Sequence, residues 1–283
     1  MPTKPVALVT GCSTGVGLHT AVRLAEAGYS VVATMRDTAK QQALFDVAAD
    51  VGVEIEVRPL DVCHQASIDT AVRAVIAAHG RIDVLVNNAG AGFLGSVEQT
   101  SDDDLRRTME TNFFGVWNVT KAVLPQMREQ GSGRIISVTS VGGLLGQPFN
   151  EAYCAAKFAV EGMMEGLAPL AQQFGVKVSL VEPGPINTEF VASVRSTSQD
   201  SLAAMAEPYA TLAQRYMAAS GNVFATYGQT GDDIARIIAG LAQAESPDFR
   251  TITSDFAMAT VASKVVDRTG NAVIEAFASR LRG

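Results

Sequence analysis

The stretch that decides the fold lies near the start of the chain and reads Val6-Ala7-Leu8-Val9-Thr10-Gly11-Cys12-Ser13-Thr14-Gly15-Val16-Gly17. Its apolar first half predicts a buried strand over 6–10, and the residues after the glycines predict a helix over 16–27. Glycines allow the backbone to approach a pyrophosphate closely, and the free N–H groups at the start of the helix attract that anion. A glycine-rich turn also joins many strands to helices without binding a ligand. Its position at the start of an alternating chain favours the nucleotide site.

The rest of the chain repeats this alternation of apolar runs and helical stretches. Further strands are predicted at 30–35, 54–58, 82–86, 134–139, 176–181 and 249–253. Helices are predicted at 38–51, 66–78, 101–130, 151–174 and 232–244. Buried strands separated by helices indicate an α/β fold, a doubly wound parallel sheet of the Rossmann type.

No linker or run of charge divides the sequence, so we expect residues 1–283 to form a single domain. Residues 189–229 lack a strand pattern and follow a late strand. In an α/β sheet this is where a helical segment usually covers the substrate. The remainder, 230–283, is expected to hold C-terminal helices and the last strand.

Composition excludes several classes of function. The net charge is −7 and no basic cluster is present, which argues against a nucleic-acid partner. Three cysteines without paired spacing indicate neither a disulfide framework nor a metal site, and they suit a reducing, cytoplasmic location. No apolar run has the length of a membrane span or a signal peptide.

The end of the second predicted strand bears on the choice of cofactor. An NAD enzyme usually carries a carboxylate there for the ribose hydroxyls, whereas this strand ends in Met35 and Arg36. Arg36 could pair with a 2′-phosphate, to which Ser13 and Thr14 could donate, so the sequence favours NADP. The alternative is that Arg36 is merely a solvated residue at a strand end.

Two other strand ends fit the same nucleotide site. Asp61 and Val62 close the third strand, where they could contact an adenine. Asn88, Ala89 and Gly90 follow the fourth strand, and their small side chains would let a cofactor lie against the backbone. An Asn-Asn pair beside glycine is also an ordinary turn, so this motif has little weight alone.

Tyr153 and Lys157 are the candidates for proton transfer. They lie four residues apart on a predicted helix and therefore share one face. A free tyrosine has a pKa near 10, and a neighbouring ammonium would lower the pKa of Tyr153 toward neutrality. Tyr-x-x-x-Lys also occurs by chance in many helices, so further groups are needed.

Ser140 and Asn112 supply those further groups. Ser140 follows a strand and could orient a substrate oxygen, but Ser137 and Thr139 compete for that role. Strand alternation puts Ser140 on the face opposite both competitors without showing which face looks into the site. Asn112 is a poor helix former in the middle of the predicted helix 101–130, where it could hold a water that relays protons to Lys157.

Taken together, these motifs resemble the short-chain dehydrogenase/reductase superfamily in its compact branch. The resemblance runs from Val6 to about residue 190 and identifies the catalytic tetrad as Asn112, Ser140, Tyr153 and Lys157. It also selects Ser140 over its competitors by its spacing to Tyr153. The resemblance implies cofactor contacts from the glycine loop, from the later strand ends and from the Pro-Gly segment that follows the sixth strand: Gly11, Ser13, Thr14, Gly15, Val16, Gly17, Arg36, Asp61, Val62, Asn88, Ala89, Gly90, Tyr153, Lys157, Pro183, Gly184, Ile186 and Thr188.

Within that family, three segments look like the group of estradiol 17β-dehydrogenase and photoreceptor retinol dehydrogenase: 10–25, 31–37 and 142–162. The likeness implies NADP, a bulky apolar alcohol or ketone such as a steroid or retinoid, and a homodimer or homotetramer paired through the helices of Asn112 and Tyr153. The estradiol enzyme holds the far steroid hydroxyl with a histidine, which the stretch 217–221 lacks. The residues expected to line the substrate pocket are Phe93, Leu94, Leu144, Leu145, Gln147 and Phe149.

The same residues are compatible with two other functions. A β-ketoacyl or general carbonyl reductase would share the same motifs. A catalytically silent regulator that senses NADP is an alternative of another class, but such a protein would be expected to lose the tyrosine or the lysine, and both are present.

Overall fold

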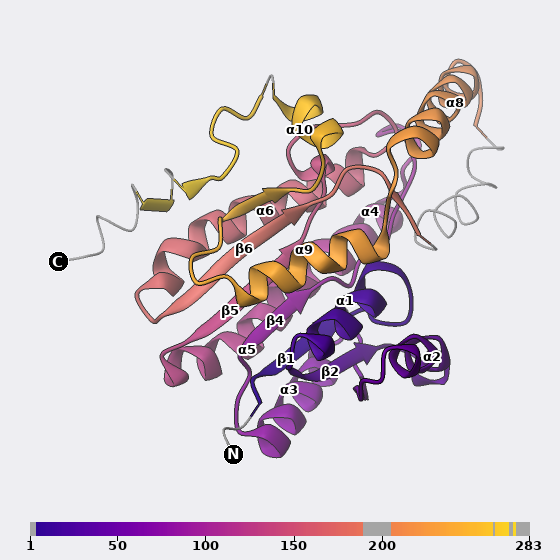
Figure 1. Ribbon diagram of the computed structural model, residues 1–283. Coiled ribbons are helices and arrows are strands. Elements are labelled where there is room, and N and C mark those ends of the chain that lie inside the picture. Colours follow the sequence, from indigo (N-terminus) through magenta and orange to yellow (C-terminus); the bar gives the residue numbers. More distant parts are fainter. Residues whose placement is uncertain (1–3, 189–204, 263, 272–273, 276–283) are drawn as a thin grey trace.

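The computed structural model describes residues 4–188, 205–262, 264–271 and 274–275. Seven parallel strands form a twisted sheet in the order β3-β2-β1-β4-β5-β6-β9, with helices on both faces (Figure 1). This confirms the predicted doubly wound α/β fold.

The strands have the bounds β1 Val6–Thr10, β2 Ser30–Met35, β3 Glu56–Pro59, β4 Val84–Asn87, β5 Gly133–Val138, β6 Val176–Glu182 and β9 Arg250–Ile252, and a separate short pair is formed by β7 Ile186–Asn187 and β8 Gln229–Thr230. The α-helices are α1 Gly15–Glu26, α2 Gln42–Asp50, α3 Gln65–His79, α4 Asp102–Met109, α5 Gly115–Gln130, α6 Glu151–Gln172, α8 Tyr209–Tyr227, α9 Gly231–Gln243 and α10 Asp255–Val261. Short 3₁₀ turns cover Thr38–Lys40 and Val141–Gly143.

Each face of the sheet has its own apolar core. Because side chains alternate along a strand, Leu8 and Leu85 face the layer of α3, α5 and α6, whereas Val9 and Val86 face the layer of α1, α2 and α9. All four side chains are fully buried. The two faces explain why the strands read as continuous apolar runs rather than as alternating ones.

The order of the strands creates the place for a ligand. From β1 the chain first adds β2 and β3 on one side, and then returns to add β4, β5 and β6 on the other. The loops after β1 and β4 therefore diverge from neighbouring strand ends. Ligands of open α/β sheets bind in the crevice at such a switch point.

The helix predicted over 101–130 differs from its prediction in one respect. It runs as α4 and α5 joined by a π-helical turn over Glu110–Phe114, and Asn112 lies in the middle of that turn. A π turn accommodates an extra residue in the helix and is frequent at functional sites.

Of the segment 189–229, the residues from 205 onward are described, and most of them form α8. Residues 189–204 and 276–283, which the predictions also covered, lie outside the described residues. Figure 1 shows α8 at the upper edge of the molecule, beyond the carboxyl ends of the strands.

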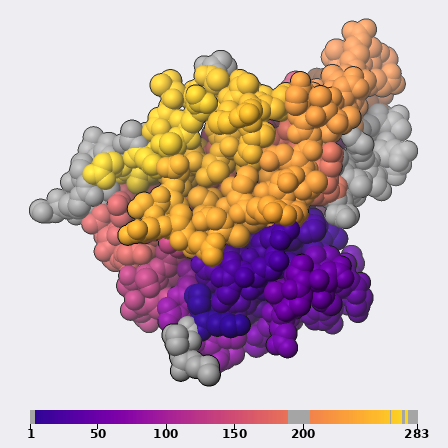
Figure 2. Space-filling view, in the orientation of Figure 1, coloured from indigo at the N-terminus to yellow at the C-terminus, as the bar shows by residue number. Residues whose placement is uncertain are grey.

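The C-terminal part of the chain packs onto the N-terminal part (Figure 2). Helix α9 lies along α1, where Arg23 binds Asp232 in a bidentate pair at 2.6 Å and 2.7 Å. Over the described part of the chain, no helix has both the length and the apolar character needed to cross a membrane.

Leu85 tests the core beneath the sheet. Leu85→Ala should lower the free energy of unfolding by about 2–5 kcal/mol, because the surrounding strands and helices cannot close the cavity that it leaves. Leu212→Ala in α8, whose wild-type side chain is 48% exposed, should change it by less than about 0.5 kcal/mol. Chemical denaturation measures both, and equal effects would contradict this description of the core.

Candidate active site

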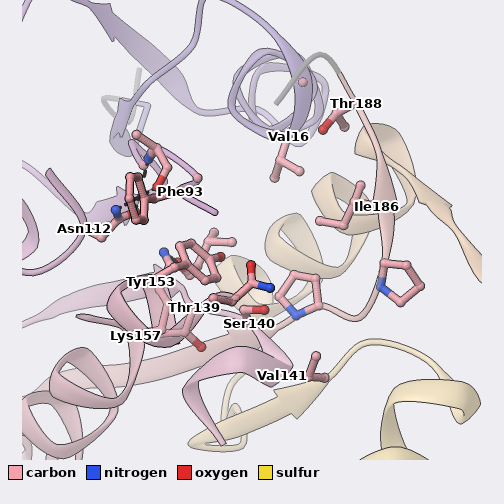
Figure 3. A pocket seen from close by; sticks show the side chains of 18 of the residues that line it. Val16, Phe93, Asn112, Thr139, Ser140, Val141, Tyr153, Lys157, Ile186 and Thr188 are labelled. Carbon is pink, nitrogen blue, oxygen red and sulfur yellow. Dashed lines mark hydrogen bonds between the residues drawn. The ribbon is translucent and has the colours of Figure 1, made fainter. Parts of the chain in front are cut away.

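A cavity of about 770 Å³ lies at the carboxyl ends of β1, β4, β5 and β6. All four members of the predicted tetrad and all of the predicted cofactor contacts line it. Figure 3 shows Asn112, Tyr153, Lys157 and Ser140 facing Val16, Ile186 and Thr188 across this space. The structure therefore gathers into one cavity residues from eight separate stretches of the sequence: 11–17, 36, 61–62, 88–90, 112, 140, 153–157 and 183–188.

The glycine loop fits closely against the loop after β4. The side-chain amide of Asn88 donates to the carbonyls of Thr10 and Gly11, at 2.9 Å and 3.1 Å. A Cβ on Gly17 would lie 2.2 Å from the Gly11 carbonyl oxygen, and one on Gly11 would lie 2.8 Å from Ala89 Cα. These glycines leave a backbone-lined groove that suits a dinucleotide.

The start of α1 is suited to a phosphate group. Its first turn carries no acidic residue, whereas α4 begins with Asp102 to Asp104 and α9 carries Asp232 and Asp233. Acids in the first turn of a helix offset its positive end, and none does so at the start of α1, where the helix borders the cavity. Thr14 at the N-cap makes no side-chain capping bond and lines the cavity.

Arg36 extends from the end of β2 at the rim of the cavity and is exposed. Among the described residues it makes no salt bridge, and the neighbouring Asp37 instead caps the amide of Ala39. Asp61, another acid of the cavity wall, also has a partner other than Arg36: one of its carboxylate oxygens accepts a hydrogen bond from the backbone N–H of Cys63. The guanidinium is thus available to an anionic ligand.

The three hydroxyls at the end of β5 have different partners. Ser137 is buried and accepts from Asn87, and Thr139 is buried and donates to Glu161. Ser140 faces the cavity, where it bonds Tyr153 and accepts from the amide of Gly142 at 3.0 Å. The structure thus places Ser140, rather than either competitor, beside the tyrosine.

The surroundings of Tyr153 differ from the expectation. Burial raises the pKa of Tyr153 to about 12, and the hydrogen bond from Ser140 opposes that rise. The Lys157 ammonium lies 5.7 Å from the centre of the ring and donates to the Val138 carbonyl at 3.0 Å. Contrary to the prediction, the ammonium does not bring the pKa of Tyr153 toward neutrality in the protein alone, because desolvation of the phenolate dominates.

Lys157 is 5% exposed, which is rare for a lysine. Burial lowers the pKa of Lys157 to about 8, and the charge of Glu161 opposes that change. A buried cation at the edge of a cavity is costly and is a common mark of a functional site.

Asn112 is fully buried, and its side chain is used within the protein. The amide oxygen accepts from the Ala91 N–H at 3.1 Å, and the amide nitrogen donates to the carbonyls of Ala91 and Thr108 at 2.8 Å and 3.0 Å. A Cβ on Gly90 would lie 3.0 Å from this oxygen and 3.8 Å from Lys157 Nζ. Asn112 therefore fixes the loop after β4 next to the lysine. A water relay through it stays a prediction.

The predicted substrate pocket divides into two groups. Phe93, Leu94, Leu145 and Gln147 line the cavity. Leu144 and Phe149 lie behind its wall, which corrects the prediction. Leu144 packs on the α10 helix. Phe149, with a φ of 61°, packs on Met205 and Tyr216. A positive φ turns the side chain away from the face that strand or helix periodicity would indicate.

Part of the cavity wall comes from α10, where no site residue was predicted. Phe256 and Thr260 line the cavity beside residues of α8, and the Phe256 ring stacks on Tyr227 with centroids 4.3 Å apart. No local pattern in the sequence marks these positions, because they meet the cavity only through the packing of two distant helices.

Comparison with known proteins agrees with this geometry. The family profile described as short chain dehydrogenase matches residues 5–199. The 17-beta-hydroxysteroid dehydrogenase type 1 of Homo sapiens is 36% identical over 280 residues, covering 97% of this chain and 85% of that protein. The retinol dehydrogenase 8 of Bos taurus is 38% identical over 277 residues, covering 93% and 86%.

Among solved structures, an actinorhodin polyketide ketoreductase with NADPH superposes with a TM-score of 0.75 at 30% identity, covering 88% of this chain and 96% of that one. The chain belongs to the short chain dehydrogenase family and is an oxidoreductase that acts on CH–OH groups. The family and its solved neighbour with NADPH support a nicotinamide cofactor for this chain.

Gly17 tests the fit of the glycine loop. In Gly17→Ala the new methyl group would collide with the Gly11 carbonyl and the Asn88 amide, so NADPH affinity should fall by at least about tenfold. Gly240→Ala on α9, where a methyl group meets open space, should leave that affinity unchanged. Fluorescence titration of NADPH measures both, and full affinity in Gly17→Ala would show that the loop has room to spare.

Proposed function

We propose that this chain is an NADP(H)-dependent oxidoreductase that interconverts a ketone or aldehyde and an alcohol, on a bulky apolar substrate such as a steroid or retinoid. The observation that carries the proposal is the continuity of the cavity. It runs from the glycine loop, past Ser140, Tyr153 and Lys157, to an apolar end between α8 and α10.

The proposed tetrad supplies proton transfer and orientation, while the bound nicotinamide supplies or accepts the hydride. Tyr153 and Ser140 present two hydroxyls from one side, which suits a substrate oxygen that gains or loses a proton. The raised pKa of Tyr153 keeps it protonated, as a proton donor to a carbonyl must be. Lys157 holds positive charge behind it and would contact the ribose hydroxyls, and Asn112 fixes the adjacent loop.

The preference for NADP rests on Arg36. Its guanidinium stands at the end of β2 without an acidic partner among the residues described, and Ser13 and Thr14 line the same cavity. A guanidinium pairs well with a 2′-phosphate, and no carboxylate ends this strand to accept bonds from free ribose hydroxyls.

A bulky apolar substrate is supported by the far end of the cavity. Most side chains there are apolar, with a few polar groups among them. The apolar side chains are Phe93, Leu94, Leu145, Met217, Val223, Phe224 and Phe256. Ala219 and Ser220 line the α8 wall, where the estradiol enzyme's histidine would be expected, so a substrate with a different far end from estradiol is favoured.

Pairing of subunits is part of the same proposal. The helices that carry Asn112 and Tyr153 expose large apolar side chains, as a helix face that packs against another copy would. They are Leu105, Phe114, Trp117, Phe158 and Leu170, with Phe174 just beyond the end of α6. A homodimer or homotetramer would cover them.

The function is tested by following NADPH oxidation with a panel of carbonyl compounds, with NADH in parallel. The panel contains 17-keto steroids, retinal, β-ketoacyl thioesters and small ketones. Turnover of the steroids or retinal supports the proposal. Turnover only of thioesters or small ketones would replace the substrate by that of a β-ketoacyl or general carbonyl reductase. NADPH binding without any turnover would favour a silent regulator.

Tyr153→Phe tests the proton donor. The variant keeps the ring but lacks the hydroxyl, so turnover should fall by about 10²-fold or more while the Kd of NADPH changes by less than about twofold. The matched control is Tyr29→Phe, because the Tyr29 hydroxyl bonds the Ala242 carbonyl far from the cavity. Normal turnover in Tyr153→Phe would remove Tyr153 from the mechanism.

Arg36→Leu tests the 2′-phosphate contact. The variant should weaken NADPH binding by about tenfold or more, since a charge-assisted pair is lost, and should leave NADH binding unchanged. Arg236→Leu on α9, an exposed arginine outside the cavity, serves as the control for net charge. Equal losses for both cofactors in Arg36→Leu would contradict the role.

A further inference from the structure

Behind the wall of the proposed tetrad, three carboxylates surround one arginine. Arg250 of β9 donates to Glu161 of α6, to Glu182 of β6 at 2.6 Å and to Glu165 of α6 at 3.0 Å. The side chains of Arg250, Glu161 and Glu182 are 9%, 6% and 0% exposed, whereas Glu165 is 40% exposed. Buried charges of this kind stabilise a fold less than apolar packing would, so we expect the cluster to have a role other than stability.

The cluster reaches the tetrad through one hydrogen bond. Thr139 donates to Glu161 at 2.6 Å, and both groups are buried. Thr139 stands directly between Val138, whose carbonyl accepts from Lys157, and Ser140, which bonds Tyr153. Through Thr139, Glu161 therefore holds the backbone of residues 138–140, which supplies the carbonyl that Lys157 bonds and the serine that Tyr153 bonds.

The same carboxylate also lies against the helix that carries the other half of the tetrad. Glu161 is one helical turn beyond Lys157 on the same face of α6. A Cβ on Gly143 would lie 3.0 Å from Glu161 Cγ and 3.3 Å from the Lys157 carbonyl oxygen, so the turn after Ser140 packs directly on this part of the helix. The strand end and the helix turn thus meet at Glu161.

The charges in the cluster do not balance if every carboxyl is ionised. The groups that face the pair are Glu165 and Lys157 from α6 and Arg250 from β9. Glu182 Oε2 is buried, and no group in the described part of the chain donates to it. If Glu182 carries a proton, it becomes the donor itself and bonds Glu161. Burial raises the pKa of both carboxyls, that of Glu182 to about 8.

We propose that Glu161 and Glu182 share one proton and, held by Arg250, form a positioning unit that keeps the Ser140 end of β5 in register with the Lys157 turn of α6. Arg250 connects this unit to the last strand of the sheet, so the C-terminal part of the chain takes part in the geometry of the site. The positioning role rests on the proposed function, whereas the shared proton is a property of the folded chain alone.

The shared proton predicts how stability depends on pH. Between a pKa of 4.5 in the unfolded chain and about 8 in the folded chain, Glu182 binds a proton only in the folded state. Folding then takes up a proton at Glu182, so the contribution of Glu182 to wild-type stability decreases as pH rises through this window. Glu182→Gln keeps the size of the side chain and its ability to donate to Glu161, but it cannot ionise.

The experiment measures Tm of the full chain from about pH 5 to about pH 9 for wild type, Glu182→Gln and Glu165→Gln. The Tm of Glu182→Gln minus that of wild type should increase with pH up to about 8 and then level off. Glu165→Gln should run parallel to wild type, since Glu165 lies at the exposed rim of the cluster. A difference for Glu182→Gln that does not change with pH would overturn the shared proton.

The positioning role is read from kinetics. Glu161→Gln should lower kcat by on the order of tenfold and change the Kd of NADPH by less than about twofold, because the strand end shifts while the glycine loop does not. Glu165 lies on the same helix as Glu161 and accepts from the same arginine. Glu165→Gln should match wild type in both kcat and the Kd of NADPH. An unchanged kcat in Glu161→Gln would overturn the role. If wild type turns over no carbonyl, the proposed function fails, and the pH series still decides the proton.

Discussion

The close approach of the loops after β1 and β4 is the constraint on which the rest of the site depends. The Thr10 hydroxyl accepts hydrogen bonds from the backbone N–H groups of Asn88 and Ala89. The side-chain amide of Asn88 in turn donates to the carbonyls of Thr10 and Gly11. Such contact is sterically allowed only because Gly11 and Gly17 carry no Cβ. The loops are neighbours because β4 is added beside β1 after β2 and β3 have filled its other side.

Several buried polar groups lie near that junction. The two apolar cores make the sheet stable, whereas Lys157, Asn112 and Glu182 are buried at or behind the cavity. Each of these groups costs free energy on transfer from water, and each is retained by contacts that orient the cavity wall. The layout is that of an apolar scaffold that carries a site built from buried polar groups.

The sequence predicted the framework well and the side-chain directions less well. The strands Val6–Thr10 and Ser30–Met35 match because apolar runs between turn residues are a local signal. The π turn at Asn112, the left-handed Phe149 and the position of Leu144 were not predictable, since each depends on how distant elements pack. The direction of the Tyr153 pKa shift was also wrong, because spacing shows the nearby ammonium but not the burial.

By itself the sequence determined the α/β class and the glycine loop, because these follow from apolar periodicity and glycine sterics, and its resemblance to a known family identified the candidate tetrad. The tertiary structure supplied the physical reason why Ser140, which the resemblance had selected, faces Tyr153 while Ser137 and Thr139 do not: strand alternation gives two faces and only packing selects one. It also decided that Phe256 of α10 lines the cavity and that Arg250 reaches Glu161 and Glu182. Those contacts join segments far apart in the chain, and no local pattern encodes them.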